Sequence, residues 1–395
     1  MDLRDTADEE AFRGRLKEWL AKALPALPPA PDPLDWPGRR AYDTAWQRML
    51  YDAGYAGLHW PADAGGRGAT PAQHLIFLEE TERAGAPYVG ANFVGLLHAG
   101  PTIAAEGTAG QRARWLPPVL RGDEIWCQGF SEPGAGSDLA SLRTRAVRDG
   151  DHYVVSGSKI WTSHAEVADW CELLVRTEPV GGAVPKHRGI TWLAMRMDAP
   201  GVTVRPLRTL AGSTEFAEMF LDEVRIPVSD RVGAENDGWR VTMVTLSFER
   251  GTAFVGEVVA CRRTLGALAR TARGDGRWAA DPALRRRLGR LGAEFGALWR
   301  LTQWNVSEAQ GGAGGKGGGF GVPGVGGSVF KLRYSQARQE LYEAAADVLG
   351  PDALDLAHPW IQDRLSSLSY TIAAGTSQIQ QNIVAERILG LPKER

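Results

Sequence analysis

The chain has 395 residues, of which 44% are apolar and 23% are charged, and its formal net charge is −2. This length predicts two or three domains, and the charge balance excludes a dominant polyanion-binding surface, so no nucleic-acid partner is expected. No apolar run approaches the roughly 20 residues that span a bilayer, so no membrane partner is expected either.

The cysteines and histidines indicate neither disulfides nor a metal. Cys127, Cys171 and Cys261 lie far apart and fit no metal-ligand spacing. They cannot all pair, which predicts a reducing compartment and a cytoplasmic location. The acidic N-terminal residues lack the apolar core of a signal peptide. The seven histidines include no His-Glu-x-x-His pair, so no metal is expected.

Residues 1–122 are predicted to form an N-terminal helical domain. Apolar residues recur near helical spacing between residues 11 and 20. The proline-rich run 25–37 ends this first helix. Further along the chain, Thr70 and Pro71 are the residue types that begin a helix, at the N-cap and the first turn.

Residues 123–233 are predicted to form a middle β-domain, because short runs rich in β-branched and aromatic residues alternate with turn residues. The expected strands are residues 153–155, 170–176, 190–196, 202–206 and 218–226. Strands at this spacing are typical of a compact antiparallel barrel or sandwich.

Residues 234–395 are predicted to form a C-terminal bundle of long helices with one apolar stripe each. The expected helices are residues 239–272, 282–310, 330–349, 362–372 and 376–389. The glycine-rich segment 311–327 is expected to be a flexible connector. It is no phosphate-binding P-loop, because Gly317 follows Lys316 where Ser or Thr is required, and Gln310 replaces the first glycine.

The sequence Cys-Gln-Gly-Phe-Ser-Glu-Pro-Gly-Ala-Gly-Ser-Asp stands at residues 127–138. Its glycines and Pro133 exclude a helix, so a loop is predicted. Successive N–H groups of such a loop can bind an anion or a carbonyl oxygen. A plain turn between two elements is the alternative. A dinucleotide fingerprint is excluded, because the third glycine and the surrounding βαβ unit are missing.

Several stretches together resemble the acyl-CoA dehydrogenase family, and they follow the family order over most of the chain. They are the loop 129–138, the hairpin 156–163, residues 60–68, residues 220–227 with 236–239, and residues 373–380. The resemblance implies an α+β fold with an N-terminal α-helical domain, a middle antiparallel β-barrel and a C-terminal four-helix bundle, at 1–122, 123–233 and 234–395.

The resemblance also implies FAD as the cofactor, with its ring between the β-domain and the bundle. A flat redox ring needs an aromatic wall and a few hydrogen-bond donors. The family positions that contact the cofactor correspond to Gln128, Phe130, Ser131, Gly136, Ser137, Trp161, Thr162, Ser163, Thr376 and Gln378. Those that contact the substrate correspond to Ser137, Arg250, Ala374 and Gly375. The alternative for Trp161 is a core strand residue.

The family reaction is the α,β-dehydrogenation of an acyl thioester, in which a carboxylate removes the α proton and a hydride passes from Cβ to flavin N5. Much of the family carries this base directly before the Gly-Thr of the C-terminal motif, where this chain has Ala374. Isovaleryl-type, bacterial steroid side-chain and prolyl-carrier-protein enzymes carry it on the helix that opens the bundle. Glu249 matches that second position. The alternative is that Glu249 and Arg250 form a solvated pair on a helix face.

The resemblance further implies partners. These are an acyl-CoA or acyl-carrier-protein substrate, an electron-transfer flavoprotein as electron acceptor, and a homo- or hetero-oligomer (dimer or tetramer). The family motif Arg-x-x-Phe-Gly is missing around residues 270–278, and residues 347–351 replace Gln-x-x-Gly-Gly. Both losses make a heteromeric partner plausible. Two other functions stay open: a non-catalytic subunit of a heteromeric dehydrogenase, and a flavin-dependent oxidase or monooxygenase.

Overall fold

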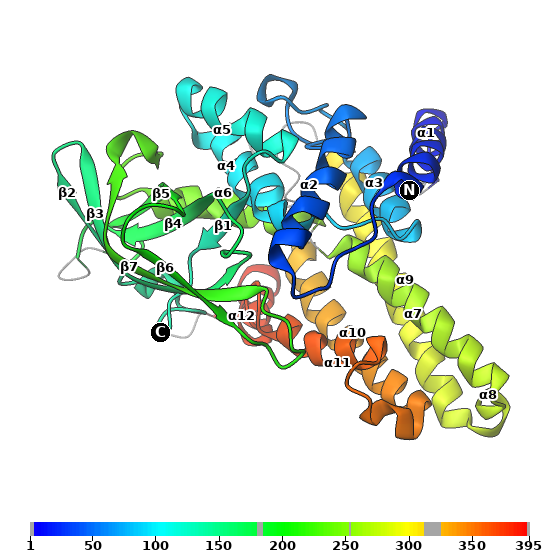
Figure 1. Ribbon diagram of the computed structural model, residues 1–395. Coiled ribbons are helices and arrows are strands. Elements are labelled where there is room, and N and C mark those ends of the chain that lie inside the picture. Colours follow the sequence, from blue (N-terminus) through cyan, green and yellow to red (C-terminus); the bar gives the residue numbers. More distant parts are fainter. Residues whose placement is uncertain (1–3, 180–184, 253, 312–324, 393–395) are drawn as a thin grey trace. The chain divides into compact units, whose positions relative to one another are not determined.

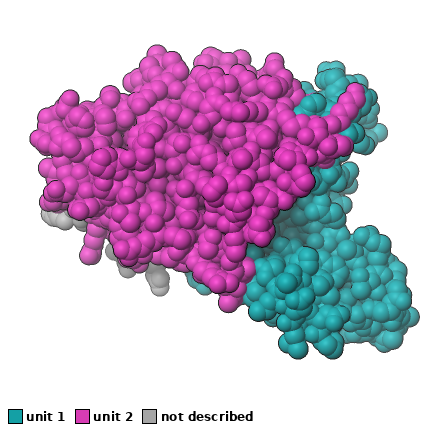
Figure 2. Space-filling view, viewed as in Figure 1, with its two compact units in different colours: residues 1–21, 70–86, 250–395 teal, residues 22–69, 87–249 magenta. Residues whose placement is uncertain are grey.

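The computed structural model describes residues 4–179, 185–252, 254–311 and 325–392, with side chains given outside 247–253 and 308–326. The chain divides into two compact units (Figure 2). Unit 1 comprises residues 1–21, 70–86 and 250–395, and unit 2 comprises residues 22–69 and 87–249. The N-terminal helices are therefore shared between the units. The domain boundaries expected at residues 122 and 233 stay a prediction.

Unit 2 contains several helices. They are α2 (Trp36–Asp52), α4 (Gly100–Glu106), α5 (Ala109–Arg121) and α6 (Gly238–Thr252), with a π-helical turn η4 (Gly95–Ala99) before α4. Side chains cap the starts of α2 and α5. Thr108 and Gln111 form a capping box at the start of α5, and Gly122 ends this helix in the left-handed region.

The sheet of unit 2 has mostly antiparallel pairs and is the middle β-domain that the sequence predicts (Figure 1). Its strands are β1 (Trp126–Gly129), β2 (Arg145–Asp149), β3 (His152–Ser163), β4 (Trp170–Arg176), β5 (Ile190–Arg196), β6 (Val202–Leu207), β7 (Phe216–Pro227) and β8 (Arg231–Val232). Their order is β6-β7-β3-β2-β4-β5-β8, and β1 pairs with β4. Both β1 and β2 join β4 in parallel.

The two faces of this sheet bury different apolar clusters, because side chains alternate along a strand. In β4, Cys171, Leu173 and Val175 belong to the cluster enclosed by the sheet. Trp170 and Leu174 belong to a second cluster, which also includes residues of η4, α4 and α5. Glu172 lies on the same face of β4 as Trp170 and Leu174, toward this second cluster.

Unit 1 is helical. Its elements are α1 (Ala7–Ala23, from its start to residue 21), α3 (Pro71–Arg83), α7 (Val255–Gly274), α8 (Arg277–Ala280), α9 (Pro282–Gly311), α10 (Val325–Leu349), α11 (Pro359–Ser367) and α12 (Ser377–Ile383). Figure 1 shows α7, α9 and α10 as long neighbouring helices, and their apolar stripes form one cluster centred on Phe295, Tyr334 and Leu341. No helix among the described residues is long and apolar enough to cross a membrane.

A polar network lies inside this bundle. The Glu257 carboxylate of α7 accepts hydrogen bonds from the hydroxyls of Tyr334 and Tyr370. Arg338 of α10 donates to Tyr334 at 2.7 Å, and its guanidinium lies 4.1 Å from the centre of the Tyr370 ring. Burial alone would lower the pKa of Arg338, but the surrounding oxygen groups raise it, so the arginine stays charged. Each of these four side chains therefore has at least one polar partner, although Arg338 Nε has none among the described residues.

The order of helices, strands and helices is confirmed, whereas three local expectations are wrong. Residues 127–129 are not loop but most of β1, since they pair with residues 171–173 of β4. The expected hairpin 156–163 is the second half of the single strand β3, which pairs with β7. The expected helix 239–272 is two helices, α6 and α7. The glycine-rich connector lies largely outside the described residues.

Two glycines of different environment allow a matched test of the packing. A methyl group at Gly129 would lie 2.8 Å from Cys171 Sγ and 2.8 Å from Leu173 Cδ1, whereas one at exposed Gly289 of α9 would meet nothing within 4 Å. We expect Gly129→Ala to lower the free energy of unfolding by about 1–3 kcal/mol. Gly289→Ala should raise it by about 1 kcal/mol. Urea unfolding of both variants measures the difference, and equal effects would contradict it.

Candidate active site

The loop after β1 lies against the end of strand β3. Glu132 and Ala135 close a tight turn through two backbone hydrogen bonds of 3.1 and 3.0 Å. One residue earlier, the carbonyl of Ser131 accepts the backbone N–H of Ile160 at 2.9 Å. This bond places Ser131 beside the C-terminal part of β3, which carries Trp161, Thr162 and Ser163. Gln128 and Phe130 precede Ser131 in the chain, and Gly136 and Ser137 follow the turn.

A buried ion pair fixes this arrangement. Lys159 of β3 is fully buried, and its ammonium group donates to Glu132 Oε1 at 2.8 Å and to the carbonyl of Phe130 at 3.1 Å. The same carboxylate accepts the backbone N–H groups of Arg143 and Thr144. Burial would raise the pKa of Glu132, but Lys159 and these donors lower it below its ordinary value. The carboxylate therefore stays ionised and holds both ends of the loop.

The residues that end β3 are held in an unusual conformation. Trp161 has a φ of 61°, in the left-handed region that non-glycine residues rarely adopt. Its side chain is 58% exposed and meets Phe216 edge to face, with 6.0 Å between ring centres. An exposed tryptophan held this way is no core residue of the described unit, so the interpretation of Trp161 as a ligand contact is favoured.

The edge of the sheet fits a flat, polar ring. Thr162 is fully buried, and its Oγ1 has no hydrogen-bond partner among the described residues. A methyl group at Gly134 or Gly136 would meet nothing within 4 Å, so the fold of the chain itself does not need these glycines. Phe130 differs from the other expected contacts, because it is buried in the apolar cluster that includes Trp126.

The C-terminal motif forms a tight turn in unit 1. Ala374 and Gly375 both have positive φ, at 52° and 85°. Their carbonyls are held by two buried side chains: Lys331 donates to Gly375 at 2.5 Å, and Gln380 donates to Ala374 at 3.1 Å. Thr376 caps helix α12 by accepting the backbone N–H of Ile379, and exposed Gln378 lies in the first turn of α12.

The expected base lies on helix α6. The backbone is helical from Gly238 to Thr252, which includes positions 249 and 250. The side chains of Glu249 and Arg250 lie outside the described part of the structure. Their catalytic assignment therefore stays a prediction.

The sequence analysis missed a buried polar cluster beside Gln128. Glu172 of β4 is fully buried, and its Oε1 accepts a hydrogen bond from Gln128 Nε2 at 2.8 Å. His98 of η4 is 6% exposed, and its Nδ1 lies 3.3 Å from Gln128 Nε2 and 3.8 Å from Glu172 Oε1. The signal was available, because Glu172 is a lone carboxylate in the otherwise apolar run Trp170–Val175.

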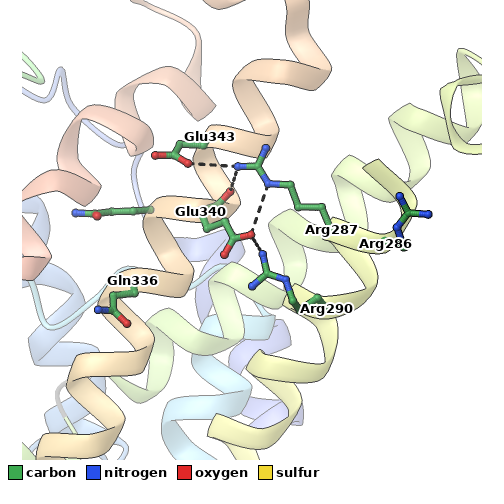
Figure 3. A pocket seen from close by; sticks show the side chains of 7 residues that line it. Arg286, Arg287, Arg290, Gln336, Glu340 and Glu343 are labelled. Carbon is green, nitrogen blue, oxygen red and sulfur yellow. Dashed lines mark hydrogen bonds and ion pairs between the residues drawn. The ribbon is translucent and has the colours of Figure 1, made fainter. Parts of the chain in front are cut away.

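A shallow hollow on unit 1 lies between α9 and α10 and holds charged side chains (Figure 3). Arg287 and Arg290 of α9 face Glu340 and Glu343 of α10, and both arginines bind Glu340. Arginines and carboxylates alternate here, so the charges compensate one another as in a surface ion-pair network. Among the described residues, no group of three His, Cys, Asp or Glu side chains is placed to hold a metal ion.

Comparison with known proteins gives the class. Models of the acyl-CoA dehydrogenase N-terminal, middle and C-terminal domains match residues 6–123, 127–224 and 236–389. The chain therefore belongs to the acyl-CoA dehydrogenase family and is an oxidoreductase. This family is generally FAD-dependent.

Some relatives match this chain over nearly their whole length. Acyl-CoA dehydrogenase IpdE1 of Mycobacterium tuberculosis is 39% identical over 395 residues, covering 98% of this chain and 99% of the relative. Among solved structures, the Tcur3481-Tcur3483 steroid ACAD matches with a TM-score of 0.82 and 30% identity. The ChsE4-ChsE5 complex from Mycobacterium tuberculosis matches with 0.82 and 31%. Each of these two matches covers 100% of both chains.

The buried pair can be tested by a double-mutant cycle. Glu132→Gln leaves the Lys159 charge buried without its carboxylate, so we expect a loss of about 3–5 kcal/mol in the free energy of unfolding. The double variant Glu132→Gln/Lys159→Met removes both charges and should lose less than the two single variants together. Additive losses in urea unfolding would contradict the coupling.

The same pair predicts a pH dependence. Because the folded pKa of Glu132 lies below its ordinary 4.5, its stabilising contribution is present above pH 4.5 and is lost as the pH falls through the lower folded value. Wild-type protein should therefore lose stability more steeply than Glu132→Gln below pH 4.5. Parallel melting-temperature curves of the two proteins would exclude this.

Thr162 allows a test of the cofactor fit. We expect Thr162→Val to leave the melting temperature of the FAD-free protein unchanged or higher, because it removes a buried hydroxyl without a partner among the described residues. FAD binding should weaken by about 1 kcal/mol, the usual net value of one hydrogen bond. Flavin fluorescence titration measures the affinity. A lower melting temperature with unchanged FAD affinity would show that Thr162 serves the fold alone.

Proposed function

We propose that the chain catalyses the FAD-dependent α,β-dehydrogenation of an acyl-CoA, with Glu249 as the base that removes the α proton. The observation that carries the proposal is Ala374, which has a methyl group where much of the family has the catalytic carboxylate. Since Ala374 has no carboxylate, a base in this chain has to come from another element. Glu249 on α6 occupies the family's second base position.

The anchoring of α6 supports this assignment. Thr245, one helical turn before position 249, is fully buried, and its Oγ1 lies 2.9 Å from Oγ1 of Thr102 in α4. Thr102 in turn donates to the carbonyl of His98. Residues four apart share a helix face, and position 249 follows Thr245 by one helical turn of α6.

The remaining groups have separate tasks. The backbone N–H of Ala374 makes no hydrogen bond within the described residues, so it is available to polarise the thioester carbonyl and acidify the α C–H. Glu249 receives the α proton as the Cα–Cβ double bond forms. Bound FAD supplies the two-electron acceptor for the hydride that leaves Cβ. Trp161 and Thr162 provide the wall and the hydroxyl that hold the ring.

Substrate and partners follow from the relatives. We propose a steroid-derived acyl-CoA, because the Tcur3481-Tcur3483 protein is named a steroid ACAD. We propose a heteromeric assembly, since both solved relatives contain two different chains and the motif losses at residues 270–278 and 347–351 affect expected FAD contacts between subunits. An electron-transfer flavoprotein as acceptor and a cytoplasmic location complete the proposal.

A second function is a non-catalytic subunit that completes the site of a partner chain. The two-chain complexes among the relatives favour it specifically. A flavin-dependent oxidase or monooxygenase differs from both functions by consuming O₂ directly. Thioester oxidation that continues without O₂, given an external acceptor, supports the dehydrogenase over this class.

The decisive experiment is anaerobic reduction of the bound flavin by acyl-CoA thioesters, steroid-derived ones included. We expect Glu249→Gln to slow flavin bleaching by at least about 100-fold, the usual contribution of a general base, with FAD content unchanged. Asp222→Asn, at an exposed position of β7, is the control and should bleach at the wild-type rate. Bleaching of Glu249→Gln at the wild-type rate would end the assignment. If none of the thioesters bleaches the flavin of the wild-type protein, even in the presence of its partner chain, the result would indicate the non-catalytic subunit.

A further inference from the structure

The buried cluster of Gln128, Glu172 and His98 is a polar island in an apolar surrounding. Gln128 of β1 lies two residues from Trp126 and two residues from Phe130, and both belong to the apolar cluster on that face of the sheet. The neighbours of Glu172 on the same face are Trp170 and Leu174 of that cluster. Burying a carboxylate in such a place costs several kcal/mol before its hydrogen bonds are counted. A polar side chain on an otherwise apolar, buried strand face is expected mainly where a function requires it.

The register of the sheet explains why these side chains meet. Gln128 and Glu172 are directly paired residues of the parallel strands β1 and β4. Adjacent side chains on one face of a sheet lie within reach of each other. His98 joins them from η4, where Phe93 packs edge to face against its ring at 5.5 Å. The cluster lies wholly in unit 2, and each of its three distances joins residues of that unit.

The geometry determines which end of the Gln128 amide is available. The nitrogen Nε2 donates to Glu172 Oε1 at 2.8 Å and lies 3.3 Å from His98 Nδ1. A carboxylate accepts hydrogen bonds but cannot donate them. Glu172 therefore selects the amide orientation in which the nitrogen points inward, and the carbonyl oxygen Oε1 lies on the opposite branch. Gln128 is only half-buried, whereas Glu172 and His98 are buried, so Gln128 is the member that a ligand can reach.

We infer that Glu172 is a positioning residue that holds the Gln128 carbonyl oxygen as a hydrogen-bond acceptor for the pyrimidine N–H of the flavin ring. The inference rests on the proposed function, because it takes the strand of Gln128 to line FAD. Glu172 acts through Gln128 and does not itself contact the cofactor. His98 Nδ1 lies 3.3 Å from the same nitrogen.

The inference predicts opposite effects on cofactor binding and on folding. Glu172→Leu replaces a buried polar side chain, whose Oε2 has no hydrogen-bond partner among the described residues, by an apolar one between Trp170 and Leu174. The FAD-free protein should therefore melt at the same or a higher temperature. The freed Gln128 amide should bind FAD about 10-fold more weakly, and the flavin absorption maximum should shift. Glu172→Gln keeps an acceptor oxygen and is the matched control, with FAD affinity within about 2-fold of wild type.

A double variant tests whether Glu172 acts through Gln128. Gln128→Leu should weaken FAD binding as Glu172→Leu does, and Glu172→Leu/Gln128→Leu should be no weaker than Gln128→Leu alone. FAD affinity of the full-length protein is measured by titration and the melting temperature by calorimetry, neither of which depends on turnover.

Three results would overturn the inference. Glu172→Leu could bind FAD like wild type, it could lose only acyl-CoA affinity, or it could lower the melting temperature together with FAD affinity, which indicates a purely structural role. In each of these cases wild-type protein still binds FAD, so the proposed function stands. Wild-type protein that takes up no FAD, alone or with its partner chain, would refute both.

Discussion

The described half of the site depends on one buried ion pair, between Lys159 and Glu132. Its carboxylate ties the loop to strand β3 through the lysine and to the start of β2 through the backbone of Arg143 and Thr144. A loop held only by backbone turns can shift. If this loop moved away from β3, the buried Lys159 would lose the carboxylate that pairs with its charge, which is costly in an apolar interior. The position of the loop relative to Trp161 and Thr162 is therefore fixed by the sheet.

The sequence predicted what depends on local chemistry. The order of helices and strands follows from periodicity and turn residues. The loop after β1 and the end of β3 can be recognised from their composition. The assignment of residues 127–129 to a loop failed because their strand character comes from pairing with β4, more than 40 residues away in the chain. The break between α6 and α7 likewise has no proline to signal it.

The missed cluster shows the same limit in the site. Gln128 was expected from the family resemblance, but its two partners come from η4 and β4, and neither is near it in sequence. Glu172 looks like one polar residue in an apolar strand until the register places it opposite Gln128. His98 could equally have been a satisfied core histidine. Side-chain clusters assembled across several elements need the tertiary fold, whereas a contiguous motif does not.

The C-terminal turn shows that backbone shape and side-chain chemistry can separate. Ala374 lies in the left-handed region, which costs an alanine about 1 kcal/mol or more. Lys331 and Gln380 offset this cost by holding the carbonyls of the turn. The turn therefore keeps its backbone amide without carrying a carboxylate, which is why a base on another helix is compatible with an otherwise ordinary family motif.

The open space beside Gly134 and Gly136 affects how substitutions in this loop are interpreted. An alanine at either position costs the polypeptide nothing in packing, because no neighbouring atom lies within 4 Å. Selection for abundant, folded protein alone would let both glycines drift. A substitution at either position that lowers activity but not stability would therefore act on a molecule bound by the chain.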